Sequence, residues 1–357
     1  MKQLVYFSIT ALVAATMMGM DRGCVSAPTT DTISTSAAVT VKGTINQVND
    51  ATGAFIATVD GSTRLSVNGA FRPWVSTVDK TWQDVGVPLN LGVNVISGQT
   101  KRQVGAAWVN GDLAQFIVER KNDLVNRGQQ KVFLDWSAAG IDNQIKAMAT
   151  HTLNGPLSAA DLNNFVASVK AKVTSFFNST YSATQVTLVA AAGAETHTVK
   201  FFGEDRCDLY GESPGDYRNG NKTQQSNIYI GTFKCVVVDD DRLLTSTPAL
   251  KTDSVAQRVT DIGTFIARTV THELGHSLGL TADGEAALHG CEGMHNCITY
   301  DDTHPSNRFD DGHFIMDPGP RSQIWARIGV KSATDRTARA PVFNSYNRSY
   351  LKVLHGT

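Results

Sequence analysis

The stretch HELGHSLG, at positions 272–279, carries the most specific chemical pattern in this chain of 357 residues. Residues four positions apart lie on one face of a helix, so His272 and His276 can reach the same ion. Neutral imidazole is a preferred ligand of zinc, and two imidazoles leave room for a third protein ligand and a water molecule. Glu273 lies one step around the helix, close enough to accept a proton from that water. The stretch therefore predicts a zinc site on a helix.

A long helix is predicted to lead into this stretch, because apolar residues recur at the helical period between positions 255 and 270. Ser254 or Asp253 can cap its start, and Gln257 stands three residues beyond Ser254, where a capping box has its partner. Gly279 suits the left-handed residue that follows a helix end. We therefore expect the chain to turn sharply just after this residue.

The overall composition is that of a packed protein, with 41% hydrophobic and 18% charged residues. The length exceeds one average domain, so two structured units after a leader are expected. The formal net charge is −1, which argues against a nucleic-acid partner because such proteins present a basic face. No block of like charges is present, so long-range steering of a charged partner is not expected.

The first 27 residues have the form of a secretory signal: Lys2 is followed by an apolar run at 4–20. A membrane anchor is the alternative, but the run is short for a bilayer span and no other stretch approaches spanning length. Cys24 follows Gly23 as at a lipoprotein attachment site, although Asp21 replaces the aliphatic residue expected there. The chain is therefore predicted to be secreted. Residues 28–38, rich in Ser, Thr and Ala, are predicted to be a flexible linker.

Residues 39–122 have the texture of an all-β sandwich. Short alternating strands are predicted at 39–43, 55–59 and 93–97, with turn residues at roughly ten-residue spacing. The stretch 87–96 resembles the immunoglobulin-like modules common in bacterial secreted proteins. A role as a spacer or adhesion module is expected, since no polar cluster here suggests catalysis.

Residues 130–357 have a different texture and are predicted to form a second domain. Its expected elements are strands at 131–136, 185–190, 197–202 and 227–233, and helices at 158–177 and 345–354. The loop 211–221 is rich in Gly, Asn and Asp, and its oxygens can hold calcium, although the spacing lacks the regular calcium-loop pattern.

Four cysteines remain when Cys24 is set aside with the leader. An even number in a secreted chain suggests two disulfides, with three possible connectivities. Proximity in the sequence favours the pairs Cys207–Cys235 and Cys291–Cys297. A four-cysteine zinc site is the weaker alternative, because no CxxC pair is present.

The region 130–357 resembles the metzincin clan of zinc metallopeptidases. The resemblance rests on HELGHSLG followed by the turn FIMDPG at 314–319. It implies an α+β catalytic domain in which Met316 forms an apolar floor under the imidazoles and the strand 227–233 pairs with an extended substrate at the upper rim of the cleft. It also implies a metalloendopeptidase that hydrolyses peptide bonds through a zinc-bound water, with Glu273 as general base and then general acid.

The third zinc ligand departs from the clan pattern, because the position three residues after Gly279 is Ala282, which cannot coordinate. The alternatives are Asp283, His289, His295, His304 and His313. His295 is preferred because a Cys291–Cys297 disulfide would hold its loop in place. A glutamate ligand at Glu292, as in the gluzincin relatives, is disfavoured by the surrounding glycines, which oppose a helix.

Two other functions stay open at this level. One is a secreted binding or adhesion protein with a degenerate, inactive peptidase domain, suggested by the β-module and by Ala282. The other is a zinc hydrolase that acts on a non-peptide bond. The intact Glu273 between two potential ligands favours catalysis. Cleavage preference, oligomeric state and the role of the N-terminal module as propeptide, spacer or binding domain do not follow from the sequence.

Overall fold

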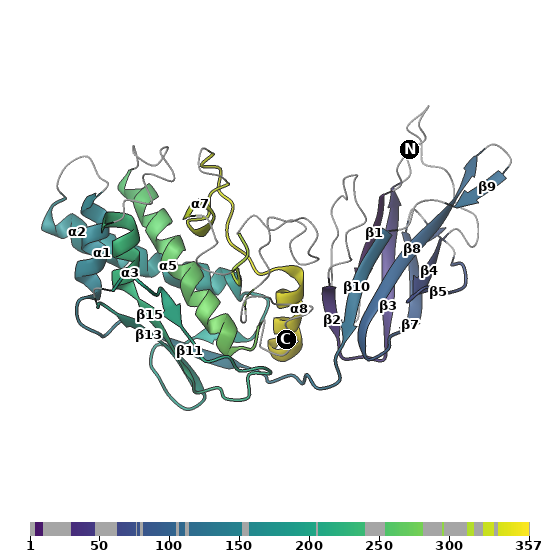
Figure 1. Ribbon diagram of the computed structural model, residues 1–357, viewed down its shortest axis with the longest axis horizontal. Coiled ribbons are helices and arrows are strands. Elements are labelled where there is room, and N and C mark those ends of the chain that lie inside the picture. The colour runs from purple at the N-terminus through teal and green to yellow at the C-terminus, as the bar shows by residue number, and fades with distance from the viewer. Residues whose placement is uncertain are drawn as a thin grey trace. The chain divides into compact units, whose positions relative to one another are not determined.

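The computed structural model describes residues 4–9, 30–46, 63–75, 77–78, 81–104, 107–110, 114–151, 157–204, 206–239, 254–280, 295, 313–317, 324–331 and 335–356. The chain divides into two compact units (Figure 1). The first contains Met1–Leu124 with two short later segments, Asp301–Arg308 and Arg348–Val353. The second contains Val125–Tyr300, Phe309–Asn347 and Leu354–Thr357.

The first unit is built from two sheets. One sheet has the order β1 (Leu4–Ile9), β3 (Ala38–Asn46), β7 (Thr81–Pro88) and β6 (Thr77–Val78). The other has the order β2 (Thr30–Ser34), β10 (Ala114–Arg120), β8 (Gly92–Val104), β4 (Thr63–Val67) and β5 (Ala70–Phe71), with β9 (Ala107–Asn110) paired to β8. The strand pairs are antiparallel except β2 with β10, which are parallel.

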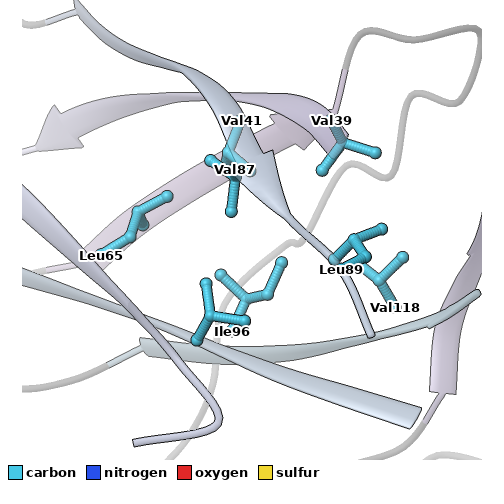
Figure 2. Close-up of a cluster of buried hydrophobic side chains, with 8 residues drawn as sticks. Val39, Val41, Leu65, Val87, Leu89, Ile96 and Val118 are labelled. Carbon is cyan, nitrogen blue, oxygen red and sulfur yellow. The ribbon is translucent and has the colours of Figure 1, made fainter. Parts of the chain in front are cut away.

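An apolar cluster joins the two sheets of this unit (Figure 2). Its buried members are Val39, Val41, Leu65, Val67, Val87, Leu89, Ile96 and Val118. The members on one strand are two residues apart, so their side chains point to the same face of the sheet. The predicted strands at 39–43 and 93–97 lie within β3 and β8, whereas 55–59 lies outside the described residues.

One N-terminal segment differs from its prediction, and a second carries a prediction that the structure does not test. The linker 28–38 is wrong in part, because Thr30–Ser34 forms β2. Thr32 and Ile33 are 1% and 0% exposed there, so the strand is buried on both faces at this point, and β-branched side chains are favoured in such strands. Leu4–Ile9, inside the predicted signal, forms β1 alongside β3, so secretion stays a prediction. Among the described residues, no helix combines the length and apolar character needed to cross a bilayer.

The second unit is built around one five-stranded sheet. The strand order is β12 (Val186–Leu188), β11 (Gln130–Asp135), β13 (Thr196–Phe202), β15 (Gln225–Tyr229) and β14 (Gly211–Glu212). The pairs are parallel except β14 with β15, which are antiparallel. The main helices are α1 (Ile141–His151), α2 (Ala159–Thr180), α5 (Val255–Ser277) and α8 (Ser345–His355). The short β14 is therefore an edge strand of opposite direction.

Helices α2 and α5 pack closely against each other. Ser158 caps α2 and Ser254 caps α5, each accepting from the backbone N–H three residues on. A Cβ added at Gly263 of α5 would lie 2.5 Å from Lys172 Cγ of α2, so the glycine permits the close approach. Gln257 does not complete the predicted capping box; its side chain donates to Asp261 instead.

The predicted strand 227–233 is wrong in its second half. β15 ends at Tyr229, and Ile230–Lys234 forms the short helix α3, followed by a π-helical turn at Cys235–Asp239. Ile230 and Phe233 are both fully buried. They lie three residues apart, a spacing that places both side chains on one face of a helix.

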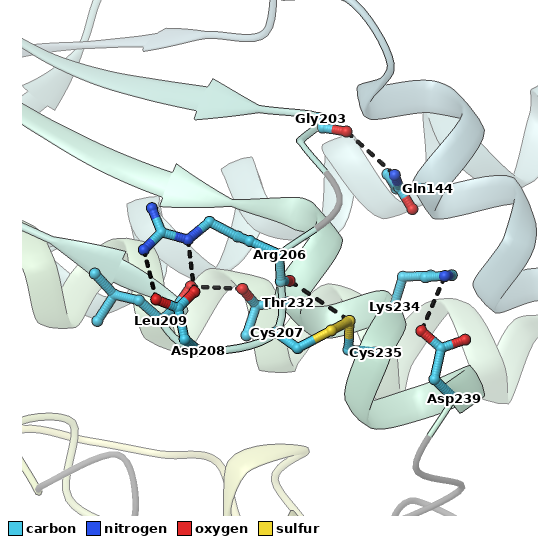
Figure 3. Close-up of a disulfide and its surroundings, with 10 residues drawn as sticks. All are labelled: Gln144, Gly203, Arg206, Cys207, Asp208, Leu209, Thr232, Lys234, Cys235 and Asp239. Atoms are coloured by element: carbon cyan, nitrogen blue, oxygen red, sulfur yellow. Dashed lines mark hydrogen bonds and ion pairs between the residues drawn. A yellow bond between two sulfur atoms is a disulfide. The ribbon is translucent and has the colours of Figure 1, made fainter.

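The predicted Cys207–Cys235 disulfide is present in the structure and ties the segment before β14 to the end of α3 (Figure 3). The same segment is held at Leu209, whose carbonyl oxygen accepts from Thr232 Oγ1 at 2.6 Å. Arg206 pairs with Asp208 through two bonds of 2.7 and 2.9 Å. These links fix the chain as it enters the edge strand. The predicted Cys291–Cys297 pair lies outside the described residues.

Candidate metal centre

The sharp turn predicted after α5 is present. Gly279 has φ +86°, a left-handed conformation that glycine adopts at no steric cost. Its N–H donates to the His276 carbonyl, and the Leu280 N–H donates to the Gly275 carbonyl, each at 2.9 Å. This pair of bonds is the Schellman arrangement, which satisfies carbonyls left without a partner at a helix end. The helix therefore stops within one turn of the second histidine.

Three imidazoles converge beside the last turn of α5. His272 Nε2 lies 3.1 Å from His276 Nε2 and 3.2 Å from His295 Nε2. All three ligand atoms lie within 4.8 Å of one another. Ligand nitrogens on a tetrahedral zinc ion, at about 2.0–2.1 Å from the metal, would be roughly 3.3 Å apart. The distances from His272 Nε2 to the Nε2 atoms of His276 and His295 are thus close to the distance between two ligand nitrogens on one zinc ion.

The protonation of His272 also fits a metal ligand. Its Nδ1 lies 2.6 Å from the Ile315 carbonyl oxygen, which can only accept, so Nδ1 carries the proton. In the neutral ring Nε2 then presents a lone pair to the other two histidines. Burial lowers the pKa of His272 well below its usual value. A bond of this kind orients the ring, as metal-bound histidines require.

His276 is similarly held in the neutral form. Burial, with a smaller effect of His295, lowers the pKa of His276 to about 3. Its Nδ1 is buried without a hydrogen-bond partner among the described residues. A neutral imidazole is the form that binds metal, because a protonated ring has no lone pair to offer.

Met316 lies directly beneath the helix that carries these histidines. The side chain is fully buried, and a Cβ added at Gly275 would lie 2.5 Å from Met316 Sδ. Gly275 stands between the two histidines of α5, so the absent side chain makes room for the sulfur. The turn itself is closed by the Asp317 N–H, which donates to the Phe314 carbonyl at 3.2 Å. Residues 318 and 319 of the predicted turn lie outside the described residues.

Glu273 is buried beside the edge strand. Burial, with a smaller effect of Glu212, raises the pKa of Glu273 to about 8. A Cβ added at Gly211 would lie 2.7 Å from Glu273 Cγ and 2.9 Å from its Oε1. Only a glycine therefore lets the main chain of β14 pass this close to the carboxyl group.

The strand at the rim of this site is not the predicted one. The prediction placed 227–233 at the edge, but β15 lies between β13 and β14. The edge is β14, whose Glu212 accepts from Asn227 Nδ2 at 3.0 Å and from the Tyr229 hydroxyl in a shorter bond. The two-residue strand has no periodic pattern, which is why the sequence gives no signal for it.

A cavity of about 320 Å³ opens next to the three histidines. Its lining includes Tyr210, Gly211, Phe265, Thr269, Glu273 and Arg327. The Arg327 guanidinium lies 4.8 Å from the centre of the Tyr210 ring and 5.6 Å from that of Phe265. The cavity is thus large enough for a side chain and is bounded partly by aromatic rings.

The structure does not bring His313 into the histidine group. His313 Nε2 lies 2.8 Å from the Val330 carbonyl, and its ring lies 5.2 Å from that of Trp325. The other candidate ligands, at 283, 289, 292 and 304, lie outside the described residues.

Within the described part of the chain, loop 211–221 contains no group of three potential metal ligands. Asp216 of that loop accepts from the Asn221 N–H. Calcium binding there stays a prediction.

Comparison with known proteins adds no identification: no protein-family model matches the sequence, and no curated protein matches it.

Proposed function

We propose that this chain is a zinc-dependent endopeptidase. The observation that carries the proposal is the convergence of three imidazoles, from His272, His276 and His295, beside the buried carboxyl group of Glu273. The donor set fits zinc because it offers three imidazole nitrogens and leaves a fourth position open. Zinc bound to these residues would polarise a substrate carbonyl and acidify a water molecule.

Glu273 would carry the protons of the reaction. The positive charge of bound zinc would favour the ionised form of Glu273, and this carboxylate would accept a proton from the attacking water and deliver it to the amine that leaves as the peptide bond breaks. Close contact with Gly211 restricts the space around Glu273 Cγ and Oε1. A carboxyl group confined in this way is oriented before the substrate arrives, which reduces the entropic cost of the proton transfer.

The substrate would bind along β14. This strand is antiparallel to β15 and lies at the edge of the sheet, so its outer main-chain groups face away from the other strands. An extended peptide can add to such an edge as a further strand. The cavity between Tyr210, Phe265 and Thr269 would then take one substrate side chain. This arrangement favours cleavage within a polypeptide.

The proposal is tested by zinc content and peptide hydrolysis together. The wild type is expected to bind about one zinc ion per chain, and His276→Ala or His295→Ala to bind it much more weakly. Glu273→Gln is expected to retain zinc and to lose hydrolysis by roughly 100- to 10,000-fold, the usual contribution of a general base. His313→Gln, which changes a histidine outside the group, serves as the matched control and should retain both properties.

Two outcomes would contradict the proposal. A wild-type chain that binds no zinc after reconstitution has no such centre. If the zinc-loaded wild type hydrolyses every peptide mixture no faster than Glu273→Gln does, the alternative of a binding protein with an inactive domain is favoured.

A further inference from the structure

A chain of hydrogen-bonded hydroxyl groups ties the segment after β14 to the end of α5. His197 Nε2 lies 2.9 Å from Ser226 Oγ. Ser213 Oγ lies 2.7 Å from Ser226 Oγ and 2.5 Å from Ser277 Oγ. Ser277 in turn donates to the Pro214 carbonyl at 3.4 Å. Side chains from two strands, one loop and one helix thus form a continuous hydrogen-bonded path.

The protons of this path can all be assigned in one direction, from His197 towards the Pro214 carbonyl. Each serine hydroxyl has a single proton. Because Ser277 donates to a carbonyl, Ser213 donates to Ser277. Ser226 then donates to Ser213, and His197 donates from its Nε2–H. This tautomer of His197 is consistent with each of the four bonds given above, and Ser226 Oγ also lies 3.4 Å from Ser277 Oγ.

The path ends beside the proposed metal site. Ser277 is the residue after His276, and Ser213 is the residue after β14. A main-chain bond reinforces the link, since the Asp216 N–H donates to the His276 carbonyl at 3.1 Å. Ser226 and Ser277 are 0% and 1% exposed, and Ser213 is half-buried between them.

We propose that Ser213 is a positioning residue for peptide hydrolysis, which holds β14 at a fixed place relative to the histidine-bearing turn of α5. The inference rests on the proposed function, because β14 is the strand on which the peptide would bind. Ser213 thereby links β14 to α5, two elements that are far apart in the sequence. Without the Ser213 hydroxyl, β14 is less fixed and must be ordered when the substrate binds. Substrate binding is therefore weakened, which raises KM, whereas zinc binding and kcat change little.

The experiment compares Ser213→Ala with Thr223→Ala in the full chain loaded with zinc. Thr223 is the matched control because its hydroxyl bonds only within the same loop, to Asn221, and is exposed. Ser213→Ala is expected to raise KM roughly fivefold, the effect of about one hydrogen bond, with kcat within about twofold and zinc content unchanged. Amide hydrogen exchange in residues 208–217 should become faster in the same variant. Ser213→Thr, which keeps a hydroxyl, should restore both properties.

Each outcome decides the inference. Exchange in 208–217 that is equal in Ser213→Ala and Thr223→Ala would overturn it, as would equal KM values. If the wild type cleaves no peptide, the proposed function fails, yet hydrogen exchange still decides whether Ser213 holds β14. Should Ser213→Ala not fold, Ser277→Ala breaks the same link from the helix and is measured in the same way.

Discussion

At Gly211 the main chain passes so close to Glu273 that a methyl group has no place. The added Cβ would lie within 3 Å of two atoms of Glu273 and of the Asn227 carbonyl oxygen. Contacts this short do not occur between well-packed atoms, so either the strand or the carboxyl group must move. The same residue thus sets both the position of β14 and the space available to Glu273.

Gly211→Ala is therefore expected to lower kcat/KM by roughly 10- to 100-fold, because a shift of about 1 Å in a catalytic group has effects of this size. Zinc content should not change, since no histidine is touched. Gly220→Ala is the control in the same loop: its Cβ would meet nothing closer than Asp216 Oδ1 at 3.5 Å. Steady-state kinetics on one peptide decides, and equal activity of Gly211→Ala and wild type would contradict the packing argument.

At the scale of elements, α5 connects the core of the second unit to the site. It is buried along most of its length, and it contacts α2 as well as β14 and β15. Tyr181, at the end of α2, donates from its hydroxyl to the Thr271 carbonyl at 3.2 Å, one residue before His272. The helix is therefore placed by packing along its whole length, and its final turn is fixed by the Schellman bonds at Gly279.

Gly279→Ala tests the end of this helix. Alanine in a left-handed conformation costs about 1 kcal/mol relative to glycine, so the free energy of unfolding should fall by about that amount. Gly193→Ala is the control, because its φ is not positive and its Cβ would lie 3.9 Å from the nearest atom, Thr196 Oγ1. Chemical denaturation of the two variants gives the comparison. Equal midpoints for both variants would show that Gly279 is not required by its conformation.

At the scale of the whole molecule, each unit has its own apolar interior, and the second unit also buries histidines. Burial lowers the pKa of His197 to about 4. The unfolded chain has an ordinary histidine pKa near 6.5, so it binds a proton that the folded state excludes. The contribution of His197 to stability is therefore complete above about pH 6.5 and is lost as the pH falls towards 4.

Acidification from pH 7 to pH 4.5 should cost the wild type about 2–3 kcal/mol of unfolding free energy through His197 alone. Glutamine in His197→Gln can still donate to Ser226 but does not titrate. Between pH 7 and pH 4.5 this variant should therefore lose about 2–3 kcal/mol less unfolding free energy than the wild type. His355, whose pKa burial also lowers, is present in both proteins and cancels in the difference. Urea denaturation of both proteins at the two pH values measures this difference in unfolding free energy. An identical pH dependence of wild type and variant would contradict the role of His197.

Local features of the site could be predicted because they depend on short-range geometry. The spacing of His272 and His276, the cap at Ser254 and the turn at Gly279 each follow from the period of a helix and the conformations allowed to single residues. The strands within β3 and β8 followed from alternation in the same way, and the apolar run at 131–136 predicted β11 as a buried strand. The linker prediction at 28–38 was wrong in part, because residues of linker-like composition are buried there in a strand. The strand prediction at 227–233 was wrong in part, because its apolar run suits a helix as well as a strand.

The sequence by itself determined one helix with two imidazoles and a carboxyl group on it, and a glycine that ends it. Only the tertiary structure decided that His295 joins them, that the Ile315 carbonyl fixes the His272 ring, and that Gly211 confines Glu273. These partners come from segments far apart along the chain. No periodic pattern links such segments, and their distances are set by how the sheet, the helices and the loops pack together.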